Sequence, residues 1–339
     1  SYDTHTLQGV IRTLRPPSTF WLSLCFPNAI TFDDEYIDFD VVDEGRRLAP
    51  FVAPTAQGKP LLQKGYSTRR FRPAYIKPKD AVDPRRLFKR RAGEAYTGTM
   101  TPQARRNAIV ADILQTHRNA HTRRQEWMAA NAVINDLVEV TGPDYPTQVI
   151  SFGRNATQTI FLTGNAQWSD PVSTPLRDLD RWGVQVQQSS TYAPTRVIMG
   201  TEAWDAFSAH PIVEKKLDTR RGSATQLETA IGTFEAVQYK GTVGASLEVW
   251  TYNDLYEDDD GNVVPFMDPK KIVLLNPAGV QGARCFGAIL DADAGYVPTE
   301  FFPKMFKEND PSVEFILTQS APLPVPERPN AVLVAKVLQ

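Results

Sequence analysis

The sequence predicts an α+β fold organised around one very long helix. Apolar residues recur with a helical period through residues 102–141, and short runs with strand-like alternation occur at 147–153, 247–252 and 312–319. The chain also contains 26 prolines, nine of them within residues 1–85. With 339 residues it is long enough for a large core and about two domains.

The N-terminal quarter is unusual because of these prolines. Residues 1–48 are expected to begin with a short helix and then to become extended. Proline is excluded from helix interiors and from central strands. We therefore expect the first hundred residues to form arms and edge hairpins with little core of their own, which become stable only when they lie against neighbouring copies.

Two segments of opposite charge follow each other in this quarter. Residues 33–44 contain seven acidic residues and no basic one, whereas residues 64–91 contain eleven Lys or Arg against two acidic residues, Asp80 and Asp83. Aromatic and basic side chains alternate from Tyr66 to Tyr75, which is typical of a two-faced ribbon. The pattern predicts a long basic β-hairpin that projects from the body.

We expect the acidic and basic segments to meet between subunits, because complementary surfaces on one chain allow contacts that propagate into rings and shells. The alternatives for the basic stretch are a nucleic-acid patch, with Phe88 interleaved among the cations, and an ordinary solvated face. The candidate contact residues are Asp33, Asp34, Glu35, Asp38, Asp40, Asp43, Glu44, Arg69, Arg70, Arg72, Lys77, Lys79, Arg85, Arg86, Lys89, Arg90 and Arg91.

The long helix has clear signals at both ends. Thr101 is a good N-cap, Pro102 occupies the first helical position, and Gly142 is a natural stop. At 1.5 Å per residue the predicted helix is about 57 Å long. It would form the backbone of an elongated subunit.

The remaining elements are shorter. Helices are expected at 176–185 and at 202–209, the second capped by Thr201. Strands are expected at 195–200, 247–252, 272–275, 312–319 and 331–337, with a hairpin turn at 258–262 and a proline-rich connection at 322–326.

The motifs of common enzymes are absent from the sequence. It has no nucleophile elbow, no phosphate-binding loop and no dinucleotide glycine fingerprint. His117 and His121 have the spacing of two metal ligands, but Arg118 stands where a zinc hydrolase has Glu, so both are interpreted as polar helix positions. Asp258 and Asp260 lack the other carboxylates of a calcium loop. We therefore predict no catalytic residue, no cofactor and no metal.

Charge and cysteine content restrict the class of protein further. The net charge of −2 differs from the basic excess that a phosphate-neutralising protein usually carries. Cys25 and Cys285 are the only cysteines, which fits two buried thiols in a chain made in a reducing cytoplasm. No apolar run approaches the length of a membrane span.

Several strings resemble the major capsid proteins of phage lambda and its relatives. The string that we single out consists of Lys216, Leu217, Asp218, Thr219, Arg220, Arg221 and Gly222. Residues 227–230 and 239–241 continue the match, and in the same order along the chain so do residues 65–68, 75–79, 291–294 and 319–323. Because the strings are collinear and cover nearly the whole chain, chance is a poor explanation.

This resemblance implies the HK97-like phage capsid fold and a structural protein of the virion that is not an enzyme. It divides the chain into an N-terminal arm (1–48), an extended loop (49–98), a peripheral domain (99–174) with a spine helix (102–141), an axial domain (175–285) and a return to the peripheral domain (286–339). Members of the family assemble in the host cytoplasm into hexamers and pentamers of an icosahedral procapsid, which expands as double-stranded DNA is packaged.

The resemblance also implies partners. These are further copies of the chain, a head decoration protein at the three-fold positions, the portal, and a scaffold or protease during assembly, with only weak contact to packaged DNA and none to membrane. Lys64, Lys77 and Lys79 lie in the extended loop, yet no partner for a covalent cross-link is identifiable. The alternatives are an encapsulin-like compartment shell and, from another class, a basic-loop nucleic-acid-binding protein.

Overall fold

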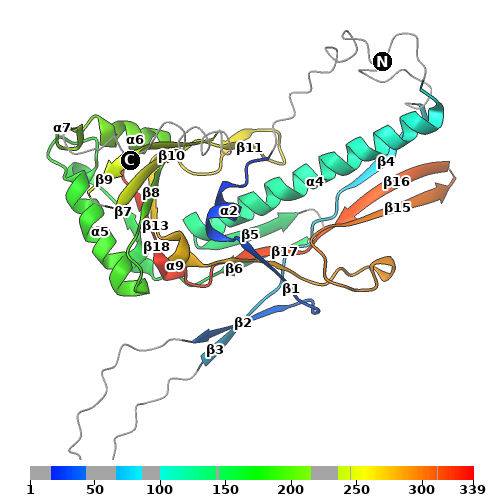
Figure 1. The fold of residues 1–339 in the computed structure, drawn as a ribbon, viewed down its shortest axis with the longest axis horizontal. Coiled ribbons are helices and arrows are strands. Elements are labelled where there is room, and N and C mark those ends of the chain that lie inside the picture. The colour runs from blue at the N-terminus through cyan, green and yellow to red at the C-terminus, as the bar shows by residue number, and fades with distance from the viewer. Residues whose placement is uncertain are drawn as a thin grey trace, which may run out of the picture.

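The computed structural model describes residues 17–42, 66–85, 100–142, 145–214, 236–244, 246–310 and 312–339. The molecule is elongated: a helix-covered sheet forms one end, and a long helix lying beside a small sheet forms the other (Figure 1). A two-stranded ribbon projects from the body between them. The expected α+β class and the single very long helix are both confirmed.

The long helix is α4 (Pro102–Ile134), which extends about 50 Å. It begins as the sequence predicts, because the hydroxyl of Thr101 accepts a hydrogen bond from the N–H of Ala104 at 3.2 Å. Its first half packs on the small sheet through Ile109. Its second half enters the main core with Met128 and Val133.

The predicted end of this helix at residue 141 is wrong. α4 ends at Ile134, Asn135 caps it, and Asp136 adopts a left-handed conformation with φ of 58°. The next residues form β5 (Leu137–Gly142), which pairs antiparallel with β6 (Tyr145–Ser151). Val138 is fully buried, whereas Leu137 and Glu139 are exposed, so the alternation of a half-buried strand ends the helix before Gly142 does.

A six-stranded sheet forms the other end of the molecule. Its strand order is β7-β18-β13-β8-β10-β9, with parallel pairs at β8–β10 and β7–β18 and antiparallel pairs elsewhere. In that order the strands are Thr159–Phe161, Val332–Lys336, Lys271–Leu275, Arg196–Met199, Leu247–Tyr252 and Val237–Val243. Strands from residues 159–161 and 332–336 thus lie in one sheet with strands from residues 196–275.

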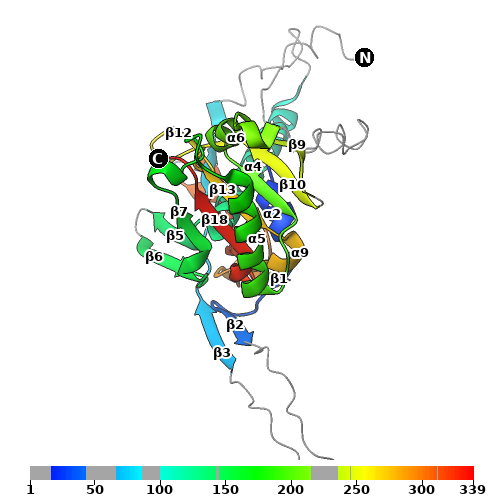
Figure 2. The same cartoon turned by 90° about the vertical axis from the view of Figure 1, so that its left-hand side faces the viewer.

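Both faces of this sheet are covered. Ile272 and Leu274 of β13 face a cluster with Trp182 of α5 (Pro175–Ser190) and Phe207 of α6 (Thr201–Ser208). The alternate residues of β13 belong to the main core with α4. Figure 2 shows α5 lying over the sheet and the ribbon extending below the body.

A second sheet accompanies the first half of α4. It is three-stranded, with order β15-β16-β4, from Phe302–Asn309, Ser312–Gln319 and Lys79–Val82. A third sheet, β1-β14-β17, consists of Asn28–Thr31, Ala283–Phe286 and Pro322–Val325. The proline-rich segment expected only as a connection is therefore largely a buried strand. Prolines fit there because β17 has just one strand neighbour in the described chain.

The expectation that the first quarter has little core of its own and needs neighbouring copies is wrong for much of residues 17–42 and 66–85, apart from the projecting ribbon (Figure 1). The short helix α2 (Phe20–Cys25) is mostly buried, with Trp21 and Cys25 at 0% exposure, and Phe26 and Ile37 are likewise inaccessible. Strands β1 and β4 each pair with C-terminal strands. Prolines stop these segments from forming a domain alone, but they do not prevent them from completing the core of their own subunit.

Other predicted elements are mostly confirmed. The helix expected at 176–185 is α5, which is longer at both ends, and the turn at 258–262 closes the hairpin of β11 (Leu255–Glu257) and β12 (Val263–Pro265). Thr201 is not the cap of α6, because the helix begins at Thr201 and Gly200 takes the cap position. Further short helices are α7 (Pro211–Glu214), α9 (Pro277–Val280) and the 3₁₀ turns at 156–158, 164–166, 292–294 and 329–331.

Candidate functional site

His117 and His121 form no metal site in the described part of the chain, where no group of three or more potential ligands converges. Both are polar positions of α4, as interpreted, and their side chains are buried between this helix and the small sheet. Nε2 of His117 lies 2.9 Å from a carboxylate oxygen of Asp80, and its Nδ1 lies 3.1 Å from the hydroxyl of Thr318. That hydroxyl lies 3.1 Å from Nε2 of His121.

These contacts form a continuous hydrogen-bond chain. The Asp80 carboxylate accepts a hydrogen bond from Nε2–H of His117. The hydroxyl of Thr318 bridges Nδ1 of His117 and Nε2 of His121. Burial and the neighbouring His117 lower the pKa of His121 to about 4, so it stays neutral. The chain joins the long helix to two strands and serves packing.

The projecting ribbon pairs the two oppositely charged segments within one subunit. β2 (Ile37–Val42) and β3 (Tyr66–Phe71) are antiparallel, with Asp38 opposite Arg70. Arg70 donates to both carboxylate oxygens of Asp38 at 2.8 Å, and Arg72 pairs with Glu35. The strand partner of the basic segment is therefore the acidic segment, which the prediction of a hairpin within residues 64–91 missed. The charges of these four residues are used inside the subunit.

An aromatic ladder holds the base of this ribbon against the body. The rings of Phe32, Phe39, Phe71 and Phe152 follow one another with centroid distances of 5.9, 6.4 and 5.7 Å. The guanidinium of Arg69 donates to the carbonyl of Phe152 and fills the space that a Cβ would need at Gly153, whose φ is +82°. The body of its own subunit therefore sets the direction in which the ribbon leaves.

The other predicted contact residues are distributed along this region. Lys79 lies 3.9 Å from the ring centroid of Phe315 and 3.6 Å from Glu308, within its own subunit. Lys77, Arg85, Asp33 and Asp34 are exposed. Outside the described residues lie Asp43, Glu44, Arg86, Lys89, Arg90 and Arg91, the string Lys216–Gly222 and the side chain of Asp40.

Sequence reasoning missed Glu126, which fastens the N-terminal arm to α4. Its carboxylate is fully buried and accepts hydrogen bonds from the backbone N–H of Trp21 at 2.7 Å and of Leu22 at 3.0 Å. Burial raises the pKa of Glu126 to about 8, although the two N–H donors act in the opposite direction. The available signal was an acidic residue next to Trp127 and Met128 in the apolar half of the helix.

Arg154 is a second missed residue, at the C-terminal end of α4. Its guanidinium donates to the carbonyls of Val133 at 2.7 Å and Ile134 at 2.8 Å, which are free because the helix ends there. Lys271 adds a second cation, 3.3 Å from the side-chain oxygen of Asn135. Both positive charges are stabilised by the negative end of the helix dipole.

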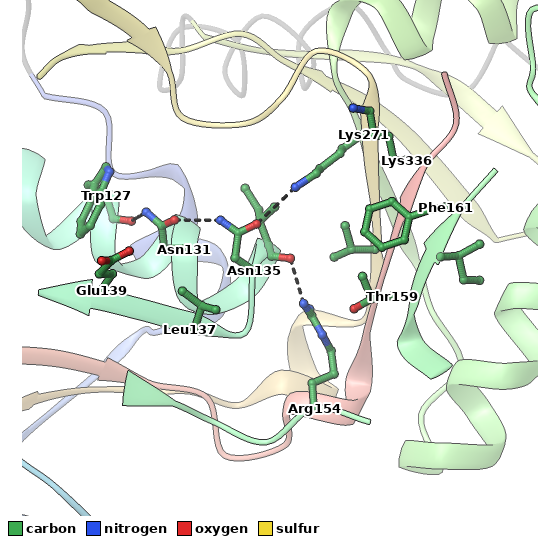
Figure 3. Close-up of a pocket in the computed structure, with 13 residues that line it drawn as sticks. Trp127, Asn131, Asn135, Leu137, Glu139, Arg154, Thr159, Phe161, Lys271 and Lys336 are labelled. Atoms are coloured by element: carbon green, nitrogen blue, oxygen red, sulfur yellow. Dashed lines mark hydrogen bonds between the residues drawn. The ribbon is translucent and has the colours of Figure 1, made fainter. Parts of the chain in front are cut away.

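A groove of about 440 Å³ opens beside this helix end (Figure 3). Trp127, Leu137 and Phe161 give it an apolar lining, and Phe161 is 66% exposed. Arg154, Lys271, Lys336 and Glu139 stand around them. Apolar side chains with charged residues around them are the composition of a contact surface.

The comparisons with known proteins agree with a structural role. The sequence matches the family described as phage major capsid protein E over residues 3–337. The chain belongs to this family. It is 32% identical over 344 aligned positions to a P21 prophage-derived major head protein of Escherichia coli O6:H1 (strain CFT073), with 99% of each chain covered. It is 28% identical to the major capsid protein of Escherichia phage lambda, with 89% of each chain covered.

Solved structures of phage capsid proteins share the fold. A prophage capsid protein from E. coli CFT073 superposes with a TM-score of 0.74 at 26% identity, covering 98% of this chain and 97% of its own. The capsid of a native GTA particle shares only 12% identity but has a TM-score of 0.51, which shows the HK97-like fold. As a member of the phage major capsid family, the chain is a shell subunit of the virion. Within the described residues, no helix has the length and hydrophobicity of a membrane span.

Proposed function

We propose that this protein is the major head subunit of a tailed double-stranded DNA phage, and that it forms hexamers and pentamers of an icosahedral shell around the genome. The observation that carries the proposal is the β2–β3 ribbon. Its base is fixed by the aromatic ladder, while its outer pairs from Asp40–Thr68 to Val42–Tyr66 extend from the body (Figure 1). An isolated two-stranded ribbon is marginally stable in water, so a neighbouring copy would support it.

Some of the predicted contact residues have partners within their own subunit, so fewer of them are candidates for contacts between subunits. Arg70 and Arg72 have partners in their own subunit, and Lys79 lies against Phe315. The remaining candidate cations are Lys77 and Arg85, which are exposed, together with Arg86, Lys89, Arg90 and Arg91, which lie outside the described residues. The matching acidic residues are Asp33, Asp34, Asp43 and Glu44. We propose that these two sets meet between subunits.

Further partners follow from the family. We propose a head decoration protein bound at the three-fold positions, a portal, and a scaffold or protease during assembly. Contact with packaged DNA would be weak and non-specific, because a net charge of −2 supplies no surplus of cations for phosphates. We propose no catalytic activity for this subunit.

Two alternatives are separable by experiment. An encapsulin-like shell would enclose an enzyme, and it has less support because the sequence relatives are phage head proteins. A basic-loop nucleic-acid-binding protein would remain a small oligomer with salt-dependent affinity for DNA.

The test is expression of the full chain, followed by sedimentation and electron microscopy of the product. Capsomers and closed shells are expected. A chain that remains monomeric and binds duplex DNA in low salt would overturn the proposal, and so would shells that carry an enzyme as cargo in the natural host.

A further inference from the structure

The groove beside the end of α4 has the composition of a protein–protein contact. Its aromatic and aliphatic lining residues Trp127, Phe161 and Leu137 are surrounded by charged residues of both signs. Protein interfaces have such an apolar centre with a polar rim, and buried aromatic anchors dominate their binding energy. Phosphate groups would gain little from the exposed ring of Phe161, so a nucleic acid is a poor match.

The described part of the chain also carries a projecting element of complementary chemistry. Leu290, Tyr296 and Val297 lie on one loop, residues 290–297, and are 54%, 61% and 57% exposed. Residues 290–300 contain three carboxylates and no Lys or Arg, and Lys304 offsets one of these charges. The groove, by contrast, presents Arg154, Lys271 and Lys336 against Glu139.

This 290–297 loop is held in a fixed shape. The carboxylate of Asp291 accepts hydrogen bonds from Lys304 at 3.0 Å, from the side chain of Gln319 at 2.6 Å and from the N–H of Asp293 at 3.0 Å. A bridge between Ala288 and Pro298 closes the base of the loop. An ordered loop loses little conformational freedom when it binds, so three apolar side chains held in place favour association.

The loop and the groove of one subunit cannot meet each other. In Figure 1 the loop that precedes β15 projects beside the small sheet. The residues that line the groove lie at the C-terminal end of α4 and on β18, in the helix-covered sheet. A contact between two different surfaces of identical subunits is heterologous and can propagate through a ring or shell.

We propose that the 290–297 loop of one copy docks in the Trp127–Leu137–Phe161 groove of a neighbouring copy. Tyr296 and Val297 contact the Phe161 ring, and Asp293, the exposed carboxylate of the loop, faces Lys271. This contact rests on the proposed assembly function and names two surfaces that make it.

The first test introduces one thiol on each surface, as Phe161→Cys with Tyr296→Cys in the full chain. The native Cys25 and Cys285 are both 0% exposed, so they do not compete for a short thiol-reactive cross-linker. The expected result is a ladder of covalently joined subunits from assembled particles. The matched control is Phe161→Cys with Leu255→Cys. Leu255 is 50% exposed and lies on a different acidic element, the β11–β12 hairpin. Equal cross-linking in both pairs, or none in particles that contain the first pair, would overturn the contact.

A second variant keeps the proposal testable if the thiol pair assembles poorly. Phe161→Asp places a charge in the centre of the groove and is expected to lower the particle yield roughly tenfold or more, because interface anchors carry most of the binding energy. Circular dichroism should show a folded subunit. Normal particle yield from Phe161→Asp would contradict the contact. If the unmodified chain itself forms no shells, it is the proposed function that fails.

Discussion

Glu126 and Trp21 are 105 residues apart in sequence, and the carboxylate of one accepts the backbone N–H of the other at 2.7 Å. The adjacent N–H of Leu22 binds the second carboxylate oxygen at 3.0 Å. Both N–H groups belong to the first turn of α2, where a helix has no internal acceptors for them. One side chain of α4 therefore satisfies the buried start of the arm helix and fixes its position on the core.

Glu126→Ala should release this arm. Two buried N–H groups would lose their acceptor, at a cost of about 1–3 kcal/mol each, so the free energy of unfolding should fall by about 2 kcal/mol or more. Limited proteolysis should then cut near residues 17–27 faster than in the unmodified protein. Gln125→Ala, at the adjacent and partly exposed position, is the control. Equal protease resistance of Glu126→Ala and the unmodified chain would contradict this role.

The same residue should make stability decline as the solution becomes more alkaline. The pKa of Glu126 is about 8 in the folded chain, against an ordinary value of 4.5. Between these two pH values the folded state retains a proton that the unfolded state has lost, so the free energy of unfolding falls as the pH rises, by about 1.4 kcal/mol per pH unit. Denaturation curves from pH 5 to 8 should show this slope, and Glu126→Gln should remove it.

Because of His121, the free energy of unfolding should rise with pH under acidic conditions, opposite to the effect of Glu126. Its pKa is lowered to about 4 from an ordinary value of 6.5. Between these values the unfolded chain binds a proton more readily, so stability is lost as the pH falls from 6.5 toward 4. In His121→Gln this part of the acid sensitivity should disappear, as urea titrations at several pH values would reveal. An unchanged slope would mean that other groups control acid stability.

The sequence was informative where the local pattern and the packing agree. Thr101 and Pro102 mark the start of α4, and the alternation in residues 312–319 gives β16. It failed at the end of α4, where Gly142 was taken as the stop although residues 137–142 alternate as a strand, and where the last carbonyls are bound by Arg154, 20 and 21 residues away in sequence. Long-range pairing was equally hidden: the partner of β3 is β2, across residues 43–65.

The candidate contact residues were also predictable from the sequence only in part. Composition alone identified the oppositely charged segments, but it could not tell whether they meet within or between subunits. The register of the ribbon places Asp38 opposite Arg70, which consumes part of the charge inside one chain. Glu126 was hidden because its role depends on N–H groups from a helix that lies far away in sequence.

Arg154→Met should weaken the fold locally at the end of α4. The variant keeps a long apolar side chain but loses the donors to the carbonyls of Val133 and Ile134. The expected loss is about 2 kcal/mol, since each buried acceptor left unpaired costs about 1–3 kcal/mol. Hydrogen exchange should accelerate in the last turn of α4 before it does elsewhere. Arg177→Ala, an exposed position on α5, should leave both measurements unchanged.

Reversing four cations of the basic segment should block assembly while leaving the subunit folded. The variant carries Arg85→Glu, Arg86→Glu, Arg90→Glu and Arg91→Glu. It spares Arg70 and Arg72, whose intramolecular partners Asp38 and Glu35 stabilise the ribbon. Charges of the same sign placed against the acidic segment of a neighbour would repel it, and such mispairing typically costs several kcal/mol. Sedimentation should show only slow species with an unchanged circular dichroism spectrum, whereas Arg177→Glu should still assemble. Normal shells from the fourfold variant would show that these cations face solvent.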